Sequence, residues 1–173
     1  GGGLGPGVGG RAWGAVGAGR LLEPVEIAGA GVWAAAEDHH TLDGGAVLIT
    51  AGPTREAMDP GRFISNHSSG KMGYAVARAA ARLGAKVTLI SGPTALSAPA
   101  GIERLMVESS ADMHDAVMGR IGSQNIFIAA AAVADYRPAQ IAEQKIKKSD
   151  ASSQLELVRT KDILADVAAL TRP

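Results

Sequence analysis

Apolar and polar positions along the chain fall into blocks that predict an α/β fold. Residues 47–50 form an apolar, β-branched run that stops at the turn residues 51–53, which is typical of a buried strand. Residues 73–83 place apolar side chains on a broad helical face that ends at Gly84, and residues 86–90 form a second apolar strand. This order of elements predicts one right-handed parallel unit.

The chain continues in the same manner. Residues 104–107 indicate a third strand, and the next helix is predicted to begin with Ser110 as its cap and to end near Gly122. Residues 125–132 are apolar on both faces, so we expect a fourth strand in the centre of a mostly parallel sheet.

The last stretch predicts a short strand over residues 155–158 and a helix that begins with Thr160 as its cap. An α/β domain normally returns to its sheet after such a helix. We therefore expect that C-terminal strands are missing and that the chain is an internal piece of a longer protein.

The first part of the chain has a different composition. Residues 1–20 are dominated by glycine, which costs much backbone entropy to order and favours a disordered tail or linker over a flap that covers a ligand. Residues 21–36 have mixed helical spacing. Residues 37–40 (EDHH) could bind a metal, but such a run is more typical of a solvated helix end. We place the domain boundary between residues 43 and 44.

Composition excludes several classes of protein. The 173 residues, 46% apolar and 20% charged, suit one soluble globular domain with an extension. A net charge of zero predicts no nucleic-acid or membrane partner, and the absence of cysteine excludes disulfides and thiolate zinc sites. No apolar run reaches the roughly 20 residues of a membrane span, and no signal-peptide pattern opens the chain. We expect a cytoplasmic protein.

The candidate chemistry lies between the first strand and the first helix. About twenty residues connect them, where such loops usually need roughly 2–6, and long loops in compact units are more often functional. This loop carries Arg55, Asp59, Arg62, Asn66, Ser68, Ser69 and Lys71.

The end of this loop resembles an anion site. Residues 68–71 (SSGK) open the helix, so backbone N–H groups, the helix dipole, two hydroxyls and a lysine could hold a phosphate; an ordinary polar helix cap is the alternative. The run is not a Walker motif, because Asn66 and Met72 replace the glycine and the Ser or Thr that this motif needs. It is not a dinucleotide fingerprint either.

Further charged residues are expected at the same edge of the sheet. Asp135 follows the fourth strand, where open α/β sheets bind ligands, and could orient a ribose hydroxyl, coordinate magnesium or simply form a turn. Arg55 and Arg62 could clamp a phosphate or carboxylate, or form ion pairs with Glu56 and Asp59. Lysines 145, 147 and 148 could add charge or form a solvated turn. Four positive groups at one edge favour an anionic ligand.

Three separated motifs then resemble those of the phosphopantothenate–cysteine ligases: residues 51–77 (AGPTREAMDPGRFISNHSSGKMGYAVA), 130–138 (AAAVADYRP) and 145–148 (KIKK). The resemblance covers residues 45–170. It implies a Rossmann-like three-layer fold with a mostly parallel sheet, and a homodimer with the active site at its interface. In bacteria this ligase is usually the C-terminal half of a bifunctional coenzyme A biosynthesis flavoprotein.

The resemblance also implies a two-step reaction. The carboxylate of 4′-phosphopantothenate attacks the α-phosphate of CTP in the presence of Mg²⁺, which gives an acyl-cytidylate and pyrophosphate. The amine of L-cysteine then displaces CMP and forms 4′-phosphopantothenoylcysteine. Positive charge must gather where pyrophosphate leaves.

By position, the resemblance assigns roles to particular residues. Asn66 would hold the acyl-cytidylate, Arg62 would meet phosphate charge within the chain or across the dimer, and Lys145 would neutralise charge during cytidylation. Asp135 would contact the nucleotide or the metal. The residues expected to bind the triphosphate and the nucleotide are Ser68, Ser69, Gly70, Lys71, Ala131 and Ala132.

Residues 10–27 resemble the end of a phosphopantothenoylcysteine decarboxylase, with Trp13 in place of its flap cysteine and Ala15 in place of its aspartate. We therefore expect residues 1–43 to be a remnant of that flap with a linker, and residues 44–173 to be the N-terminal part of the ligase domain. FMN would belong only to the absent decarboxylase half.

Two other functions stay open. A nicotinamide-dependent reductase would need an acidic residue after the second strand, where residues 91–93 (SGP) supply none. The second of these functions is that of a non-catalytic module that binds nucleotides or takes part in assembly. The sequence does not decide between CTP and ATP.

Overall fold

The computed structural model describes residues 7–10, 16–20, 41–146 and 154–170. The chain divides into two compact units, residues 1–41 and 42–173. In the first unit, strands β1 (Gly7–Gly10) and β2 (Val16–Arg20) pair antiparallel, so the predicted disorder of residues 1–20 is wrong for these strands. The predicted helix over residues 21–36 and the run 37–40 lie outside the described residues.

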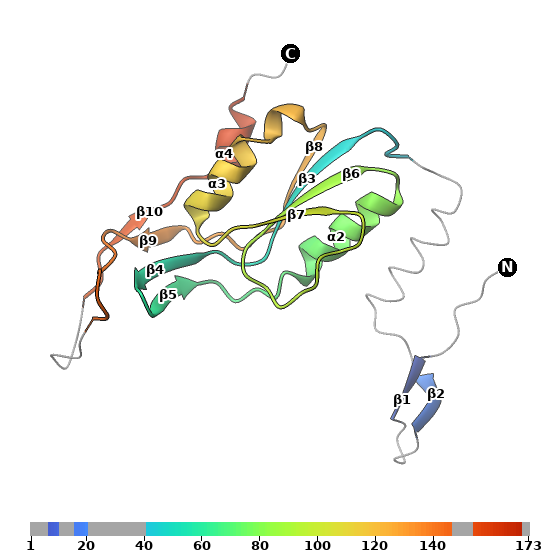
Figure 1. Cartoon of the computed structure of the whole chain (residues 1–173), viewed down its shortest axis with the longest axis horizontal. Coiled ribbons are helices and arrows are strands. Elements are labelled where there is room, and N and C mark those ends of the chain that lie inside the picture. Colours follow the sequence, from blue (N-terminus) through green and yellow to red (C-terminus); the bar gives the residue numbers. More distant parts are fainter. Residues whose placement is uncertain (1–6, 11–15, 21–40, 147–153, 171–173) are drawn as a thin grey trace. The chain divides into compact units, whose positions relative to one another are not determined.

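The second unit is built on a four-stranded parallel sheet. Its strands are β3 (Ala46–Ala51), β6 (Lys86–Ser91), β7 (Glu103–Met106) and β8 (Ile126–Ala129), in the order β7-β6-β3-β8 (Figure 1). The predicted parallel unit is therefore confirmed, with β3 and β6 as direct neighbours.

Side chains of β3 alternate between two cores, one on each face of the sheet. Val47 and Ile49 pack in the core under helix α2 (Lys71–Arg82). Leu48 packs in the other core, under α3 (Ser110–Met118) and α4 (Ile163–Ala168) (Figure 1). The predicted three-layer Rossmann-like fold is confirmed.

The expected central position of β8 is wrong for the described residues, in which β8 pairs only with β3. Its sequence is apolar on both faces because both faces are covered. Phe127 packs against the α3 and α4 core, and Ile128 packs against the α2 core. A strand between two helical layers looks the same in sequence whether or not it has a second neighbouring strand.

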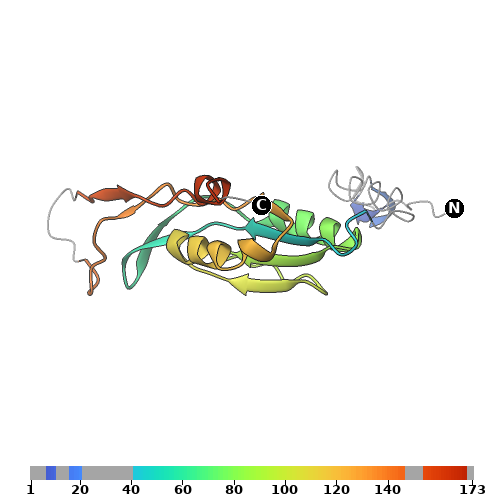
Figure 2. The same ribbon diagram turned by 90° about the horizontal axis from the view of Figure 1, so that it is seen from above.

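Two antiparallel hairpins extend from the carboxyl edge of this sheet (Figures 1 and 2). One consists of β4 (Arg55–Asp59) and β5 (Arg62–Ser65), so the expected long loop is largely a hairpin. The turn residues Pro60 and Gly61, which follow Asp59, are the sequence signal that indicates it. The other hairpin consists of β9 (Tyr136–Pro138) and β10 (Leu157–Arg159).

Two helix caps differ from the predicted ones. Ser109, not Ser110, caps α3: its Oγ accepts from the N–H of Asp112 at 3.1 Å, and the Asp112 carboxylate accepts from the N–H of Ser109 at 2.9 Å. Asp162, not Thr160, caps α4, because the Thr160 hydroxyl donates to the carbonyl of residue 134 at 2.6 Å. A 3₁₀ turn, η1 (Ile121–Ser123), follows α3. Within the described ranges no helix is long and apolar enough to cross a membrane.

Helix α2 lies so close to β3 that Gly73 has no room for a side chain, since a Cβ there would lie 2.5 Å from the Cβ of Ala51. We predict that Gly73→Ala lowers the free energy of unfolding by about 1–3 kcal/mol in urea titrations. The matched control is Gly122→Ala, where nothing lies within 4 Å of the added Cβ, and it should change stability by less than about 0.5 kcal/mol. Equal stability of the two variants would contradict the close packing.

Candidate functional site

The backbones that leave β3 and β8 stay paired beyond the end of the sheet. Pro53 and Ala132 form a parallel bridge. The N–H of Ala132 donates to the carbonyl of Gly52 at 2.8 Å, and the N–H of Thr54 donates to the carbonyl of Ala132 at 3.2 Å. These bonds place two of the predicted motifs side by side at the carboxyl edge, where open α/β sheets bind ligands.

Asn66 joins the segment after β5 to this paired backbone. Its Nδ2 donates to the carbonyls of Ala132 at 3.3 Å and Val133 at 3.0 Å. The side chain is exposed, and no described residue donates to its Oδ1. The Nδ2 end of the Asn66 amide is therefore held by the backbone, and its Oδ1 can accept a hydrogen bond from a ligand.

Helix α2 starts beside Asn66, with Gly70 as its N-cap at a φ of +74°. Ser68 Oγ accepts from the N–H of Gly70 at 3.3 Å, and Ser69 Oγ accepts from the N–H of Lys71 at 3.5 Å. The N-cap, Gly70, has no side-chain cap hydrogen bond, so the two serines only order the turn that leads into the helix. This helix start is compatible with an anion, because the next N–H groups of the first turn have no intrahelical acceptor.

We call this cluster the edge group; it comprises Asn66, Ser68, Ser69, Gly70, Lys71, Ala131 and Ala132.

A buried hydrogen-bond network lies under the edge group. The Tyr74 hydroxyl donates to Ser91 Oγ at 3.0 Å and accepts from Thr94 Oγ1 at 3.3 Å and Arg104 Nη1 at 3.2 Å. Burial raises the pKa of Tyr74, but the bonds with Ser91, Thr94 and Arg104 outweigh it, so the pKa lies below the usual 10.0. Tyr74 looked like an ordinary core residue of a helix in the sequence.

This network fixes the loop that supports Gly70. Thr94 Cγ2 would lie 2.8 Å from a Cβ at Gly70 or at Gly52, and both glycines have a positive φ. The network and the two glycines therefore set how closely the start of α2 approaches the end of β3.

A second cluster lies at the far end of the β4–β5 hairpin. The buried Asp59 carboxylate accepts from Arg62 Nε at 2.8 Å, from the N–H of Gly61 at 2.8 Å and from the N–H of Ile146 at 3.1 Å. Arg62 Nη2 also donates to the carbonyl of Ile146 at 2.8 Å. These bonds hold the segment that carries Lys145 against the hairpin. We call Arg62 and Lys145 the hairpin group.

The Arg62 guanidinium beside Asp59 holds the pKa of that carboxyl at about 2, below its usual 3.8. Burial opposes this shift, and the N–H groups of Gly61 and Ile146 add to it. From the sequence, ion pairs with Glu56 and Asp59 were an alternative role for Arg55 and Arg62. The ion pair between Arg62 and Asp59 is present.

The other expected ion pair, between Arg55 and Glu56, is absent from the described residues. Arg55 instead lies 3.5 Å from a carboxylate oxygen of Glu108 and stacks over Phe63, 4.5 Å from the ring centre. Glu56 is buried and accepts from the N–H of Ser110 at 2.8 Å, at the start of α3. This role of Glu56 depends on a contact between distant segments, which the sequence pattern does not reveal.

The two groups are separate within one chain. Strand β5 runs from Arg62 to Ser65, and at about 3.3 Å per residue it places the backbone of Arg62 roughly 13 Å from that of Asn66, the first residue of the edge group. The structure thus brings together seven of the predicted residues, Asn66 included, and it does not bring Arg62 or Lys145 to them.

Asp135 lies on the exposed turn after Ala134, which is held by a bond from its N–H to Thr54 Oγ1 at 3.0 Å. The Asp135 carbonyl accepts from the N–H of Thr160 at 3.0 Å, and its carboxylate faces solvent. Across the described residues, no three His, Asp or Glu side chains gather as a metal site. A single carboxylate here fits Mg²⁺ only together with oxygen atoms of a bound phosphate, which is how this ion is usually held.

These features define a class: a Rossmann-like α/β domain with a ligand edge built from strand-end loops and one helix N-terminus. The chain belongs to the DFP family, the DNA/pantothenate metabolism flavoprotein C-terminal domain, whose family model matches residues 42–173. This match confirms the resemblance carried by the three sequence motifs.

Similar full-length proteins share most of this chain. The coenzyme A biosynthesis bifunctional protein CoaBC of Vibrio cholerae is 56% identical over 172 residues, which cover 96% of this chain and 42% of that protein. The CoaBC protein of Escherichia coli (strain K12) is 48% identical over 171 residues, with 96% and 41% covered. The chain therefore spans about 42% of the length of these relatives.

Two solved structures have the same fold. A crystal structure of the C-terminal domain of a CoaBC protein superposes with a TM-score of 0.66 at 46% identity and covers 76% of this chain and 61% of that one. The DNA/pantothenate metabolism flavoprotein from Streptococcus pneumoniae superposes with a TM-score of 0.63 at 25% identity, with 71% and 63% covered.

The lowered pKa of Asp59 predicts an acid-sensitive hairpin. Because the folded pKa is about 2 and the usual value is 3.8, the stabilisation by the ionised carboxylate is complete above about pH 4 and is lost as the pH falls through 2. We predict that Asp59→Asn lowers stability at neutral pH, and that the deficit shrinks between pH 4 and 2. Urea titrations over this range should show that the unchanged chain takes up about one proton more on unfolding than the variant does. A deficit that is constant with pH would contradict the pairing of Asp59 with Arg62.

Proposed function

We propose that this chain supplies the nucleotide-binding part of an enzyme of coenzyme A biosynthesis that joins 4′-phosphopantothenate to L-cysteine with CTP. Membership of the DFP family and the 56% identity to a CoaBC protein support this assignment. The observation that carries it is the pair of hydrogen bonds from Asn66 to the carbonyls of Ala132 and Val133, which joins two of the motifs at one ligand edge.

The chemistry explains why such an edge is needed. A carboxylate is a poor acyl donor, so its oxygen first attacks the α-phosphorus of CTP, and the bond to pyrophosphate breaks. The amine of cysteine then attacks the acyl carbon, the bond between acyl carbon and phosphate oxygen breaks, and CMP leaves. The first step needs positive charge at the departing pyrophosphate, and the second needs the acyl-cytidylate held in place.

The edge group can supply the binding part of this scheme. The small side chains of Ala131 and Ala132 leave room for a nucleotide beside the backbone. The N-terminus of α2, with Ser68, Ser69 and Lys71, offers N–H groups, hydroxyls and a cation to the triphosphate. Mg²⁺ bound with CTP would neutralise phosphate charge, and Asp135 is the carboxylate at this edge that could contact it.

Asn66 would hold the acyl-cytidylate through its Oδ1. Because Nδ2 is engaged with two backbone carbonyls, the amide has a fixed orientation, and Oδ1 accepts from no described residue. An aspartate here would lose both donated bonds and would place a negative charge beside the carbonyls of residues 132 and 133.

The hairpin group would act across a homodimer. Arg62 donates to Asp59 and to the carbonyl of Ile146 at the far end of the hairpin and makes no contact with Asn66, so we propose that the hairpin of one copy reaches the edge group of a second copy. Both hairpins carry exposed apolar side chains, which support an interface there. These side chains are Phe63, Tyr136 and Leu157, with 49%, 45% and 45% of their surface exposed.

A chimera tests the proposed function. Residues 42–173 replace the matching region of the Vibrio cholerae relative, which keeps the rest of that protein around them. We expect pyrophosphate release that needs CTP, Mg²⁺ and 4′-phosphopantothenate, and ligated product once L-cysteine is added. Binding of NADPH without this release would support a reductase, and CTP binding without release would support a non-catalytic module. Either result would overturn the proposal.

In the same chimera, we predict that Asn66→Asp slows consumption of the acyl-cytidylate by about 10²-fold, so that this intermediate accumulates. Rapid quenching followed by chromatography measures it. The matched control is Asn125→Asp at the opposite edge of the sheet, where Oδ1 only accepts from the N–H of Ala46 at 2.8 Å and an aspartate accepts equally well. Normal turnover of the Asn66→Asp variant would refute the role of Asn66.

For Lys145→Gln we predict the loss of the cytidylation step itself, because this cation would neutralise the charge that develops on the triphosphate. Pyrophosphate release without cysteine isolates that step and should fall by about 10²-fold or more. The control is Lys161→Gln, which removes an exposed lysine 3.9 Å from Asp115, next to α4. Unchanged release in the Lys145→Gln variant would remove the assignment.

A further inference from the structure

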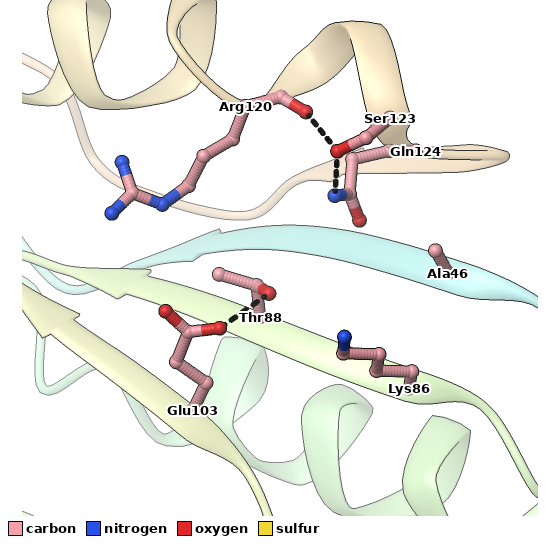
Figure 3. A pocket seen from close by; sticks show the side chains of 7 residues that line it. All are labelled: Ala46, Lys86, Thr88, Glu103, Arg120, Ser123 and Gln124. Atoms are coloured by element: carbon pink, nitrogen blue, oxygen red, sulfur yellow. Dashed lines mark hydrogen bonds between the residues drawn. The ribbon is translucent and has the colours of Figure 1, made fainter.

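A cavity lies near the amino ends of strands β3, β6 and β7, and Figure 3 shows the residues that line it. The edge group lies at the carboxyl ends of the strands. The volume of the cavity is about 240 Å³. Strands β3, β6 and β7 contribute their first residues, and the segment after α3 covers them. The residues that line it are Ala46, Lys86, Thr88, Glu103, Arg120, Ser123 and Gln124.

This cavity exists because one face of β6 changes from apolar to polar. Ile90 packs in the core under α3, but Thr88 and Lys86, which continue the same face toward the amino end, are polar. Helix α3 ends at Met118 and the chain turns away through η1, so the helical cover stops there. A strand between two helical layers is normally apolar on both faces, so this polar row is a departure that needs a reason.

The hydrogen bonds above the strands leave one acceptor unused. Ser123 Oγ donates to the carbonyl of Arg120 at 3.0 Å, so it must accept from Gln124 Nε2, also at 3.0 Å. This chain of donors fixes the orientation of the Gln124 amide. Gln124 Oε1 is buried and has no hydrogen-bond partner among the residues that the structure describes, and such acceptors are rare in folded proteins. Figure 3 shows this amide suspended over β3 and β6.

The charges around the cavity favour an anion. The Lys86 backbone N–H donates to the carbonyl of Gly45 at 2.8 Å, but its side-chain ammonium forms no ion pair or hydrogen bond with the described residues. Among the described residues, the Arg120 guanidinium donates only to the carbonyl of Ala116, at 3.5 Å. The one carboxylate, Glu103, accepts from Thr88 Oγ1 at 3.4 Å. The cavity lining therefore carries two cations, Lys86 and Arg120, and one carboxylate, Glu103, which gives it a net charge of +1.

We propose that this cavity binds a small hydroxycarboxylate. Its carboxylate would lie between Lys86 and Arg120, and its hydroxyl would donate to Gln124 Oε1. A cavity of about 240 Å³ has room for a small organic acid. The six residues of β3 span about 17 Å, so this site is independent of the edge group and of the proposed ligase chemistry.

The test is an NMR titration of the ¹⁵N-labelled 173-residue chain with glycerate, a hydroxycarboxylate, and with propionate, which lacks the hydroxyl. Both are added to about 10 mM, tenfold above a weak Kd of about 1 mM. Glycerate should give saturable shifts of the Gln124 side-chain amide and of Thr88 and Ser123, with propionate about tenfold weaker. Equal binding of the two acids would overturn the role of Gln124.

Two variants complete the test. Lys86→Met removes one exposed cation and should weaken glycerate binding by about tenfold or more, and Gln124→Glu should weaken it similarly because it adds a negative charge. Arg78→Met removes an exposed cation from α2, outside the cavity lining, and should leave binding unchanged. No saturable shift at the cavity, or shifts that survive both Lys86→Met and Gln124→Glu, would overturn the proposal.

Discussion

The pairing of two chain segments beyond the end of the sheet is the constraint on which the candidate site depends. Gly52 and Ala132 continue the contact between β3 and β8 after both strands have ended. Because backbone groups make these bonds, they set the spacing of the loops whatever side chains they carry. The Asn66 side chain then donates to the carbonyls of Ala132 and Val133. The start of α2 is then placed against this edge by Gly70 and by the network around Tyr74.

The arrangement of the rest of the domain follows from the distribution of side chains between the two faces of the sheet. Alternate residues of β3 supply two cores, so helices must cover both faces, and the strand ends are left open. At the carboxyl end the opening becomes a ligand edge with hairpins beside it. At the amino end, where α3 is too short to cover the sheet, it becomes the polar cavity around Lys86 and Gln124.

Much of this could be predicted from the sequence where local pattern and burial agree. The β-branched runs of β3 and β6 and the broad apolar face of α2 identify the parallel unit, and the unusual length of the segment after β3 points to the candidate site. The hairpin within that segment was missed because its strands are short and polar, although Pro60 and Gly61 mark its turn. The caps of α3 and α4 were misplaced by one and two residues because neighbouring Ser and Thr have other partners.

Other features depend on contacts between distant segments, and no local pattern reports them. The position of β8 in the sheet, the burial of Glu56 at the start of α3 and the hydrogen bonds of Tyr74 are of this kind. The separation of Arg62 from Asn66 is another, because the sequence places both in one loop while β5 holds them apart. The family resemblance supplied roles for these residues, but it did not show that they form two groups.

The central claim is that the loops after β3, β5 and β8 and the start of α2 form one nucleotide site. The most direct measurement follows the backbone amides of Asn66, Gly70 and Ala132 by NMR while Mg²⁺–CTP is added to the chain. One site predicts that all three shift with the same midpoint and that the Asn66 side-chain amide shifts with them. Shifts with different midpoints, or none at these three residues, would contradict the account.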